Sequence, residues 1–131
     1  MANLDYKAKN GSTGEWLYGI PVLNKMNIIN KYNDVISHCI CQIEPDTISQ
    51  FTGLKDKNGT KIYQNEIFIF KKSNKELIYL VVWMEEKACY GYKSMNTNRE
   101  IPFARFDELQ EDFLNYCEVI GNKFDNSEYL N

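Results

Sequence analysis

The sequence predicts a mainly β fold: a β-rich α+β domain of short antiparallel strands in an SH3-like barrel or a small sandwich, with one helix near residues 108–115. Three observations support this prediction. Stretches of β-branched and aromatic residues alternate with turn residues about every ten positions. Aromatic residues, which favour strands, make up 14% of the chain. Only one stretch has the period of an amphipathic helix.

Length and composition indicate a single globular domain, residues 1–131. The hydrophobic fraction is 44% and the charged fraction 25%, both ordinary values for a folded protein. A chain of this size buries enough surface to fold without a metal or a disulfide. A division into two lobes, an N-terminal β region of residues 1–47 and a barrel-like region of residues 48–131, stays open.

The first third of the chain is expected to contain four strands, the first two joined by a turn from Gly11 to Gly14. The expected strands are residues 6–9, 15–20, 25–29 and 35–43. Trp16 and Tyr18 fall on one face of the second strand, because side chains alternate along a strand. Polar residues predict a turn at 30–34, and Pro45-Asp46 predicts another.

Six more strands are expected in the remainder of the chain. They are residues 48–54, 60–63, 66–72, 76–84, 88–93 and 116–120, the last ended by Gly121. Asn58-Gly59 is the strongest two-residue hairpin signal. The eight-residue apolar run Leu77–Met84 predicts the centre of the core, a strand covered on both faces, and is far too short to span a membrane. Residues 125–130 are expected to form a final turn or short helix.

The expected helix runs from Glu108 to Asn115. Asp107 is suited to the N-cap, and Gln110 stands at the capping-box position. Phe106, Leu109 and Phe113 would then form its buried stripe, since they recur at helical spacing.

Cysteines and the one histidine are the first candidates for chemistry. Cys39 and Cys41 lie two apart, so they point the same way on a strand, and His38 points opposite. A structural zinc site needs four ligands, normally in two close pairs, and Cys89 and Cys117 do not form a second pair. No motif marks either thiol as a nucleophile. We expect no metal or cofactor, and reduced cysteines in a cytoplasm.

Paired carboxylates are the second candidate. Glu85-Glu86 follow the apolar strand, and Glu108 and Glu111-Asp112 lie on the expected helix. Such pairs can act as acid and base or hold a divalent ion. Charged residues in a turn or on an outer helix face are more typical of solvated surface. An enzyme is therefore the least favoured hypothesis, and no catalytic residue is assigned.

Lysines around two turns are the candidate interaction surface. They are Lys55, Lys57, Lys61, Lys71, Lys72 and Lys75. Basic turns with nearby aromatic residues can bind nucleic acid. The net charge of −3 and the pI of about 5.2 oppose this. If hairpins connect these strands, the two turns would lie at different ends of the barrel.

Three segments of the chain contain recognisable motifs. The central one is EPDTISQFTGLKDKNGTKIY, residues 44–63; WLYG, residues 16–19, precedes it, and EVIGN, residues 118–122, follows with DN at 125–126 and EYL at 128–130. The central segment resembles the signature of the YopX family of phage and prophage proteins, and the outer two are similar to that family's ends. The resemblance covers nearly the whole chain.

The resemblance implies a β-rich fold, a phage or prophage origin and an accessory role, and it transfers no activity. Asn65-Glu66 stand where the family usually has Gly-Asp, and Ser127 stands where it has Pro. Asparagine also adopts left-handed backbone, so the first change suits a turn. The leading hypothesis is a non-enzymatic module that binds an unknown protein partner, away from membranes. Self-association stays open, because a symmetric copy can complete a strand edge.

Overall fold

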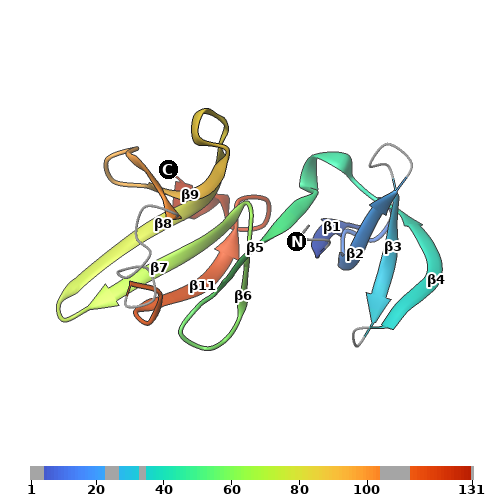
Figure 1. The fold of residues 1–131 in the computed structure, drawn as a ribbon, viewed down its shortest axis with the longest axis horizontal. Helices are drawn as coiled ribbons and strands as arrows, with labels where there is room; N and C mark the ends of the chain where they lie inside the picture. The colour runs from blue at the N-terminus through green and yellow to red at the C-terminus, as the bar shows by residue number, and fades with distance from the viewer. Residues whose placement is uncertain (1–4, 23–26, 33–34, 104–112, 131) are drawn as a thin grey trace. The chain divides into compact units, whose positions relative to one another are not determined.

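The computed structural model of the chain describes residues 5–22, 27–32, 35–103 and 113–130. It is mainly β, with two antiparallel sheets (Figure 1), which confirms the predicted fold class. The chain forms two compact units, unit 1 of Met1–Phe51 and unit 2 of Thr52–Asn131. Strand β5, Ser49–Lys55, contributes its first residues to unit 1 and its last to unit 2.

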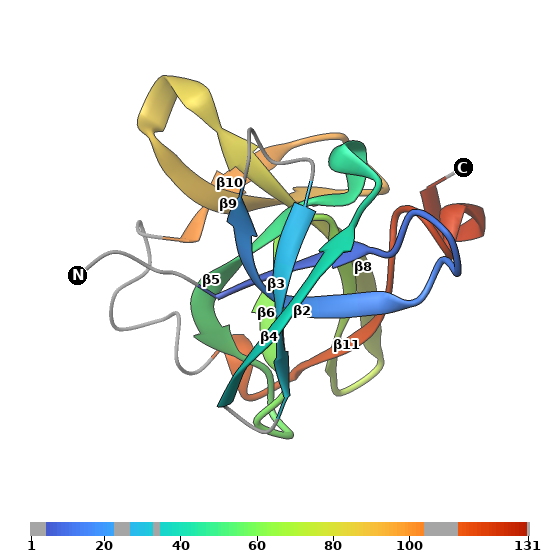
Figure 2. The same cartoon turned by 90° about the vertical axis from the view of Figure 1, so that its right-hand side faces the viewer.

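Unit 1 is an antiparallel sheet in the order β4-β3-β2-β1-β5. Besides the first residues of β5, unit 1 contains β1 (Tyr6–Lys9), β2 (Trp16–Val22), β3 (Asn27–Tyr32), β4 (Val35–Gln42) and the 3-10 turn η1 (Pro45–Thr47). Figure 2 shows β2, β3 and β4 as neighbouring strands. The β1–β2 hairpin forms as expected, because the Asn10 carboxamide accepts hydrogen bonds from the N–H groups of Ser12 and Thr13.

Strands β2 and β3 of unit 1 run past their expected last residues. Strand β2 continues through Pro21 to Val22, where it pairs with β3. Strand β3 continues to Tyr32, so the turn expected at residues 30–34 is wrong in its first half. The polar residues there are held in the sheet by pairing with β4, with an irregularity between Ile29 and Lys31. Backbone pairing overrides the local turn preference at this point.

The small core of unit 1 centres on Ala8 and Ile43, with Leu17 and Ile48 packed against them. Thr47 joins β1 to η1, since its hydroxyl accepts a hydrogen bond from the Lys9 N–H at 2.8 Å.

Unit 2 contains the second sheet, in the order β10-β9-β8-β7-β11 (Figure 1). Its strands are β6 (Lys61–Tyr63), β7 (Glu66–Lys72), β8 (Lys75–Met84), β9 (Cys89–Ser94), β10 (Glu100–Pro102) and β11 (Cys117–Asn122), and its 3-10 turns are η2 (Glu85–Lys87) and η4 (Ser127–Leu130). Strand β6 pairs with the end of β5 in the other sheet.

The core of unit 2 is aromatic and centres on Phe68, which is fully buried. The rings that surround it are those of Tyr79, Tyr92, Phe103 and Phe113, with centroids 5.4 to 6.4 Å away. Ile62 of β6 and the half-buried Leu54 of β5 pack against this cluster. Unit 2 is therefore a small sandwich, and among the described strands neither sheet closes into a barrel.

Strand β8 is central in its sheet, as its apolar run predicts, but it is not covered on both faces. Tyr79 and Val81 are buried on one face, whereas Leu80 and Val82 on the other face are only half-buried. Trp83, which follows Val81 on the first face, is 43% exposed. The prediction of a strand buried on both sides is therefore wrong at this end of β8. An apolar run does not distinguish a covered face from a face that meets solvent.

Two expectations and one strand that was not expected concern the last third of the chain. Of the helix expected at 108–115, residues 108–112 lie outside the described residues, and Phe113 and Leu114 have helical backbone. Strand β11 extends past Gly121 to Asn122. Strand β10 was not predicted, because Glu100–Pro102 shows no strand pattern and ends in proline, which fits an edge position.

Candidate binding surfaces

The central signature segment turns around one buried carboxylate, Asp56, which is 7% exposed. Its Oδ1 accepts hydrogen bonds from the N–H groups of Asn58 and Thr60, at 2.9 and 3.0 Å. Its Oδ2 accepts one from the Val119 N–H of β11 at 2.9 Å. One carboxylate therefore closes the turn and attaches it to a strand 63 positions away. The sequence predicts only that Asp56 lies in a charged turn; it does not predict these hydrogen bonds to the backbone.

The β5–β6 turn lies one residue later than the expected turn of residues 55–59, and its Asn58-Gly59 pair does not form a type I′ turn. The strands end at Lys55 and resume at Lys61, so the loop is Asp56–Thr60. Gly59 has a φ of 79°, as expected, while Asn58 is not left-handed. A type I′ turn needs positive φ at both central residues, so the Asp56 carboxylate sets this turn instead.

The next turn, between β6 and β7, contains Asn65-Glu66, the first departure from the family pattern. Asn65 has a φ of 72°, which confirms that asparagine holds the left-handed position there. Glu66 is 7% exposed, and its Oε1 accepts a hydrogen bond from the Tyr63 N–H at 2.6 Å. A glutamate in place of the usual aspartate therefore still caps the turn between β6 and β7.

In the C-terminal segment too, side-chain oxygens accept hydrogen bonds from backbone N–H groups. The Asn122 Oδ1 accepts hydrogen bonds from the N–H groups of Phe124 and Asp125, both at 2.9 Å. The Asn126 Oδ1 accepts one from the Asn122 N–H at 3.1 Å. A Cβ at Gly121 would collide with the Asn126 side chain, so only glycine fits there. These recognisable residues specify the scaffold.

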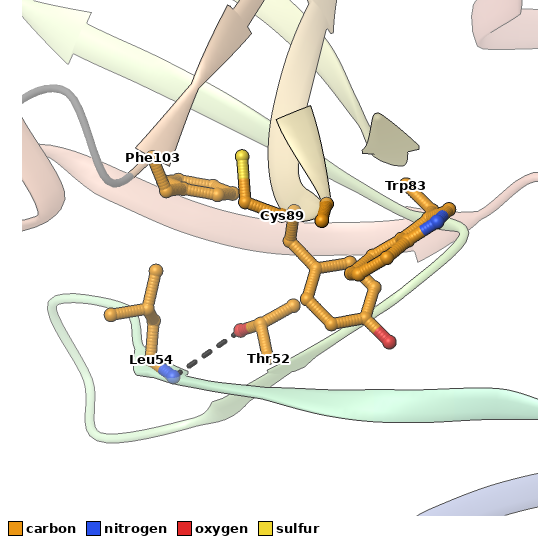
Figure 3. A pocket seen from close by; sticks show the side chains of 7 residues that line it. Thr52, Leu54, Trp83, Cys89 and Phe103 are labelled. Carbon is orange, nitrogen blue, oxygen red and sulfur yellow. Dashed lines mark hydrogen bonds between the residues drawn. The ribbon is translucent and has the colours of Figure 1, made fainter. Parts of the chain in front are cut away.

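A hollow of about 330 Å³ lies on the surface of unit 2, and we call it the aromatic groove. Its lining residues are Thr52, Leu54, Trp83, Ala88, Cys89, Tyr90 and Phe103. Figure 3 shows Thr52 and Leu54 on one side, with Trp83, Cys89 and Phe103 facing them. The sequence did not predict this site, because its residues come from separate strands and from the apolar run that was assigned to the core.

The aromatic groove is mostly apolar, and contacts between its lining residues fix its shape. Trp83 and Tyr90 meet edge to face with ring centroids 4.9 Å apart. The Thr52 hydroxyl donates to the Ile62 carbonyl at 2.7 Å and accepts from the Leu54 N–H at 3.2 Å. Ala88 has a φ of 50°, an uncommon backbone for a residue with a Cβ. None of the described residues that line the groove carries a charge, so this part of its surface suits an uncharged apolar group.

The candidate lysines lie at one end of unit 2, not at two. The Lys57 N–H donates to the Cys117 carbonyl and the Lys71 N–H to that of Tyr116, both at 3.0 Å. The two lysine-bearing turns therefore flank the start of β11, and Figure 1 draws both at the lower side of this unit. The expectation that they lie at different ends is wrong, because β11 returns between them. We call this surface the lysine end: Lys55, Lys57, Lys61, Lys71, Lys72 and Lys75.

The other candidates are not brought together where the structure describes them. Glu85 and Glu86 are exposed on η2. The side chains of His38, Cys39 and Cys41, and residues Glu108, Glu111 and Asp112, lie outside what the structure describes. Within its described part, the chain has no group of three or more potential metal ligands.

Cys117 is fully buried, and its thiol donates to the Phe113 carbonyl at 3.2 Å. Burial, with a smaller effect from the nearby Asp56 charge, raises the pKa of the Cys117 thiol to about 12. The thiol is therefore protonated at neutral pH. Cys89 is half-buried in the aromatic groove.

Among the described residues, no helix has the length and hydrophobicity needed to cross a membrane.

These features define a mainly β protein with two antiparallel sheets. Residues 5–131 match the protein family described as YopX protein, and the chain belongs to the YopX family. The crystal structure of protein EF1440 from Enterococcus faecalis is similar, with a TM-score of 0.62, 21% identity and 97% of each chain covered. That likeness shows a shared fold. Comparison with curated proteins finds no match.

Proposed function

We propose that this YopX-family chain is an accessory protein of a phage or prophage that acts in the host cytoplasm by binding a protein partner, without chemistry of its own. The aromatic groove is the proposed contact surface. The observation that carries the proposal is Trp83, a large aromatic side chain that is 43% exposed beside a preformed apolar hollow. Tryptophan and tyrosine are enriched among residues that dominate binding energy in protein interfaces.

The size and lining of the groove favour a side chain from a partner protein over a cofactor. Its volume of about 330 Å³ lies at the lower limit of small-molecule pockets. Trp83 and Ala88 are exposed and Leu54, Cys89 and Tyr90 are half-buried, so the groove is open along its length. The proposed occupant is therefore an extended segment of another protein that inserts an uncharged apolar or aromatic anchor.

The signature segment and residues outside it would both contribute to this surface. Thr52 and Leu54 belong to the central signature segment, so that segment supplies one wall as well as the scaffold. The protonated Cys117 thiol is consistent with a role outside nucleophilic catalysis, since the thiolate is the nucleophile.

Peptide selection on the full chain tests the proposal. We expect a displayed library of random extended peptides to yield binders with an apolar or aromatic anchor. Trp83→Ala should weaken these binders at least about tenfold, because removal of a central interface aromatic typically costs about 2 kcal/mol or more. Tyr18→Ala is the matched control, since Tyr18 is also 43% exposed but lies in unit 1.

Three outcomes would contradict the proposal. The library could yield no binder, or its binders could be insensitive to Trp83→Ala. The third is a wild-type dimer in sedimentation that Trp83→Ala dissociates, which would make a second copy of this chain the occupant.

A further inference from the structure

We infer that the lysine end of unit 2 is a second binding surface, one that takes single-stranded nucleic acid. This goes beyond the protein-binding role of the aromatic groove, and the two sites share no residue. The first observation is the distribution of charge in residues 55–75. The stretch contains the six lysines and two acids, Asp56 and Glu66. Both acids are 7% exposed and accept backbone hydrogen bonds, so the stretch presents positive charge outward.

The second observation is an unfavourable pairing at the β7–β8 turn. Lys72 and Lys75 are directly opposite each other in the register. Like charges at such positions destabilise a sheet. Within the described part of the chain, neither has a carboxylate partner, whereas Lys71 pairs with Glu76 at 3.6 Å. A bound phosphate between Lys72 and Lys75 would turn this repulsion into attraction.

The third observation is a hollow at the same turn that combines these charges with an aromatic ring. A space of about 630 Å³ is lined by Phe70, Lys72, Ser73, Asn74 and Lys75. Among the described residues, the lining has hydroxyl, amide and ammonium donors and no carboxylate. Ser73 has a φ of 57°, a conformation more usual for glycine, and such strain is more common at functional sites.

Aromatic side chains beside the hollow distinguish nucleic acid from other polyanions. Tyr116, half-buried at the start of β11, has the Lys72 Nζ 4.9 Å from its ring centroid. Its ring lies 6.0 Å from that of Phe70. A base can stack on such a ring while lysines on either side bind the flanking phosphates, which is how proteins bind single strands without sequence preference. The two lysine-bearing turns flank Tyr116, so a strand could run from one to the other across it.

Fluorescence anisotropy with a labelled oligothymidylate of about 12 nucleotides tests the inference on the full chain, a length within the site sizes of such proteins. We expect binding that weakens about tenfold between 50 and 200 mM salt, as expected for two to three neutralised phosphates. Lys72→Glu combined with Lys75→Glu should weaken it at least tenfold. The two glutamates of this variant are again like charges directly opposite each other, so the free energy of unfolding should change little.

The control is Lys87→Glu combined with Lys123→Glu, which changes the net charge equally at exposed positions outside the lysine end. We expect it to keep most of the affinity. Equal weakening by both double variants would overturn the site, as would absence of oligonucleotide binding at 50 mM salt.

Tyr116→Leu separates nucleic acid from a general polyanion surface. It keeps apolar packing against Phe70 and removes the ring. We expect it to weaken oligothymidylate binding about fivefold or more, which corresponds to the lower end of base-stacking energies. Competition by inorganic polyphosphate should stay unchanged. If Tyr116→Leu leaves oligonucleotide affinity intact, the surface binds polyanions without reading bases, and the nucleic-acid inference fails.

Discussion

Replacement of Phe68 by alanine is expected to unfold unit 2 or leave it barely stable. Phe68 is fully buried and is surrounded by the rings of Tyr79, Tyr92, Phe103 and Phe113. Truncation of a buried phenylalanine costs about 3–5 kcal/mol, a large part of the free energy of unfolding of an ordinary domain. Urea unfolding monitored by near-ultraviolet circular dichroism measures the loss.

Graded variants separate cavity formation from general sensitivity at this position. Phe68→Leu keeps part of the volume, so it should lose clearly less stability than Phe68→Ala. Tyr18→Ala, at an exposed position of unit 1, should change the free energy of unfolding by less than about 1 kcal/mol. A Phe68→Ala variant within about 1 kcal/mol of wild type would show that the core is not centred on this ring.

Replacement of Asp56 by alanine is the second change with a large expected effect. It leaves the N–H groups of Asn58, Thr60 and Val119 without their acceptor. Hydrogen bonds to a charged group contribute about 1.5–3 kcal/mol each, but water can reach part of this turn, so we expect a total loss of about 3 kcal/mol. The same urea titration measures it.

Asp56→Asn tests the geometry of that carboxylate. An amide can keep one oxygen for the turn, but then its NH₂ group faces the Val119 N–H, so one bond is replaced by a donor–donor contact. We expect a loss of about 1–2 kcal/mol, between wild type and alanine. Asp46→Asn, at an exposed position on η1, is the control and should stay within about 0.5 kcal/mol of wild type. Equal stability of Asp56→Asn and wild type would contradict the assigned role of Oδ2.

The strands could be predicted from the sequence because local signals and tertiary pairing agree for most of them. The bounds of β1 and β7 match the expected residues, and those of β4, β8 and β9 match within one or two positions. Agreement fails where pairing overrides composition. Polar residues of β3 stay in the sheet up to Tyr32, and Pro102 is accepted at the edge strand β10.

The candidate sites were harder to predict, because they depend on which residues meet across the fold. In the sequence, Asp56 is one more charged residue in a lysine-rich turn, and its hydrogen-bond partner Val119 is 63 positions away. Trp83 sits in an apolar run, and no local pattern indicates that its end of β8 faces solvent. The lysines were identified by residue type, but their convergence on Tyr116 and Cys117 follows from the return of β11 between the two turns.

The central claim is that the aromatic groove around Trp83 binds a segment of a partner protein. The chain has two tryptophans, so Trp16→Phe leaves Trp83 as the only one. Titration of this variant with a selected peptide, measured by tryptophan emission, tests the claim directly. We expect a saturable blue shift of the emission, because the peptide removes a half-exposed indole from water. Peptide binding that leaves the Trp83 emission unchanged would contradict the claim.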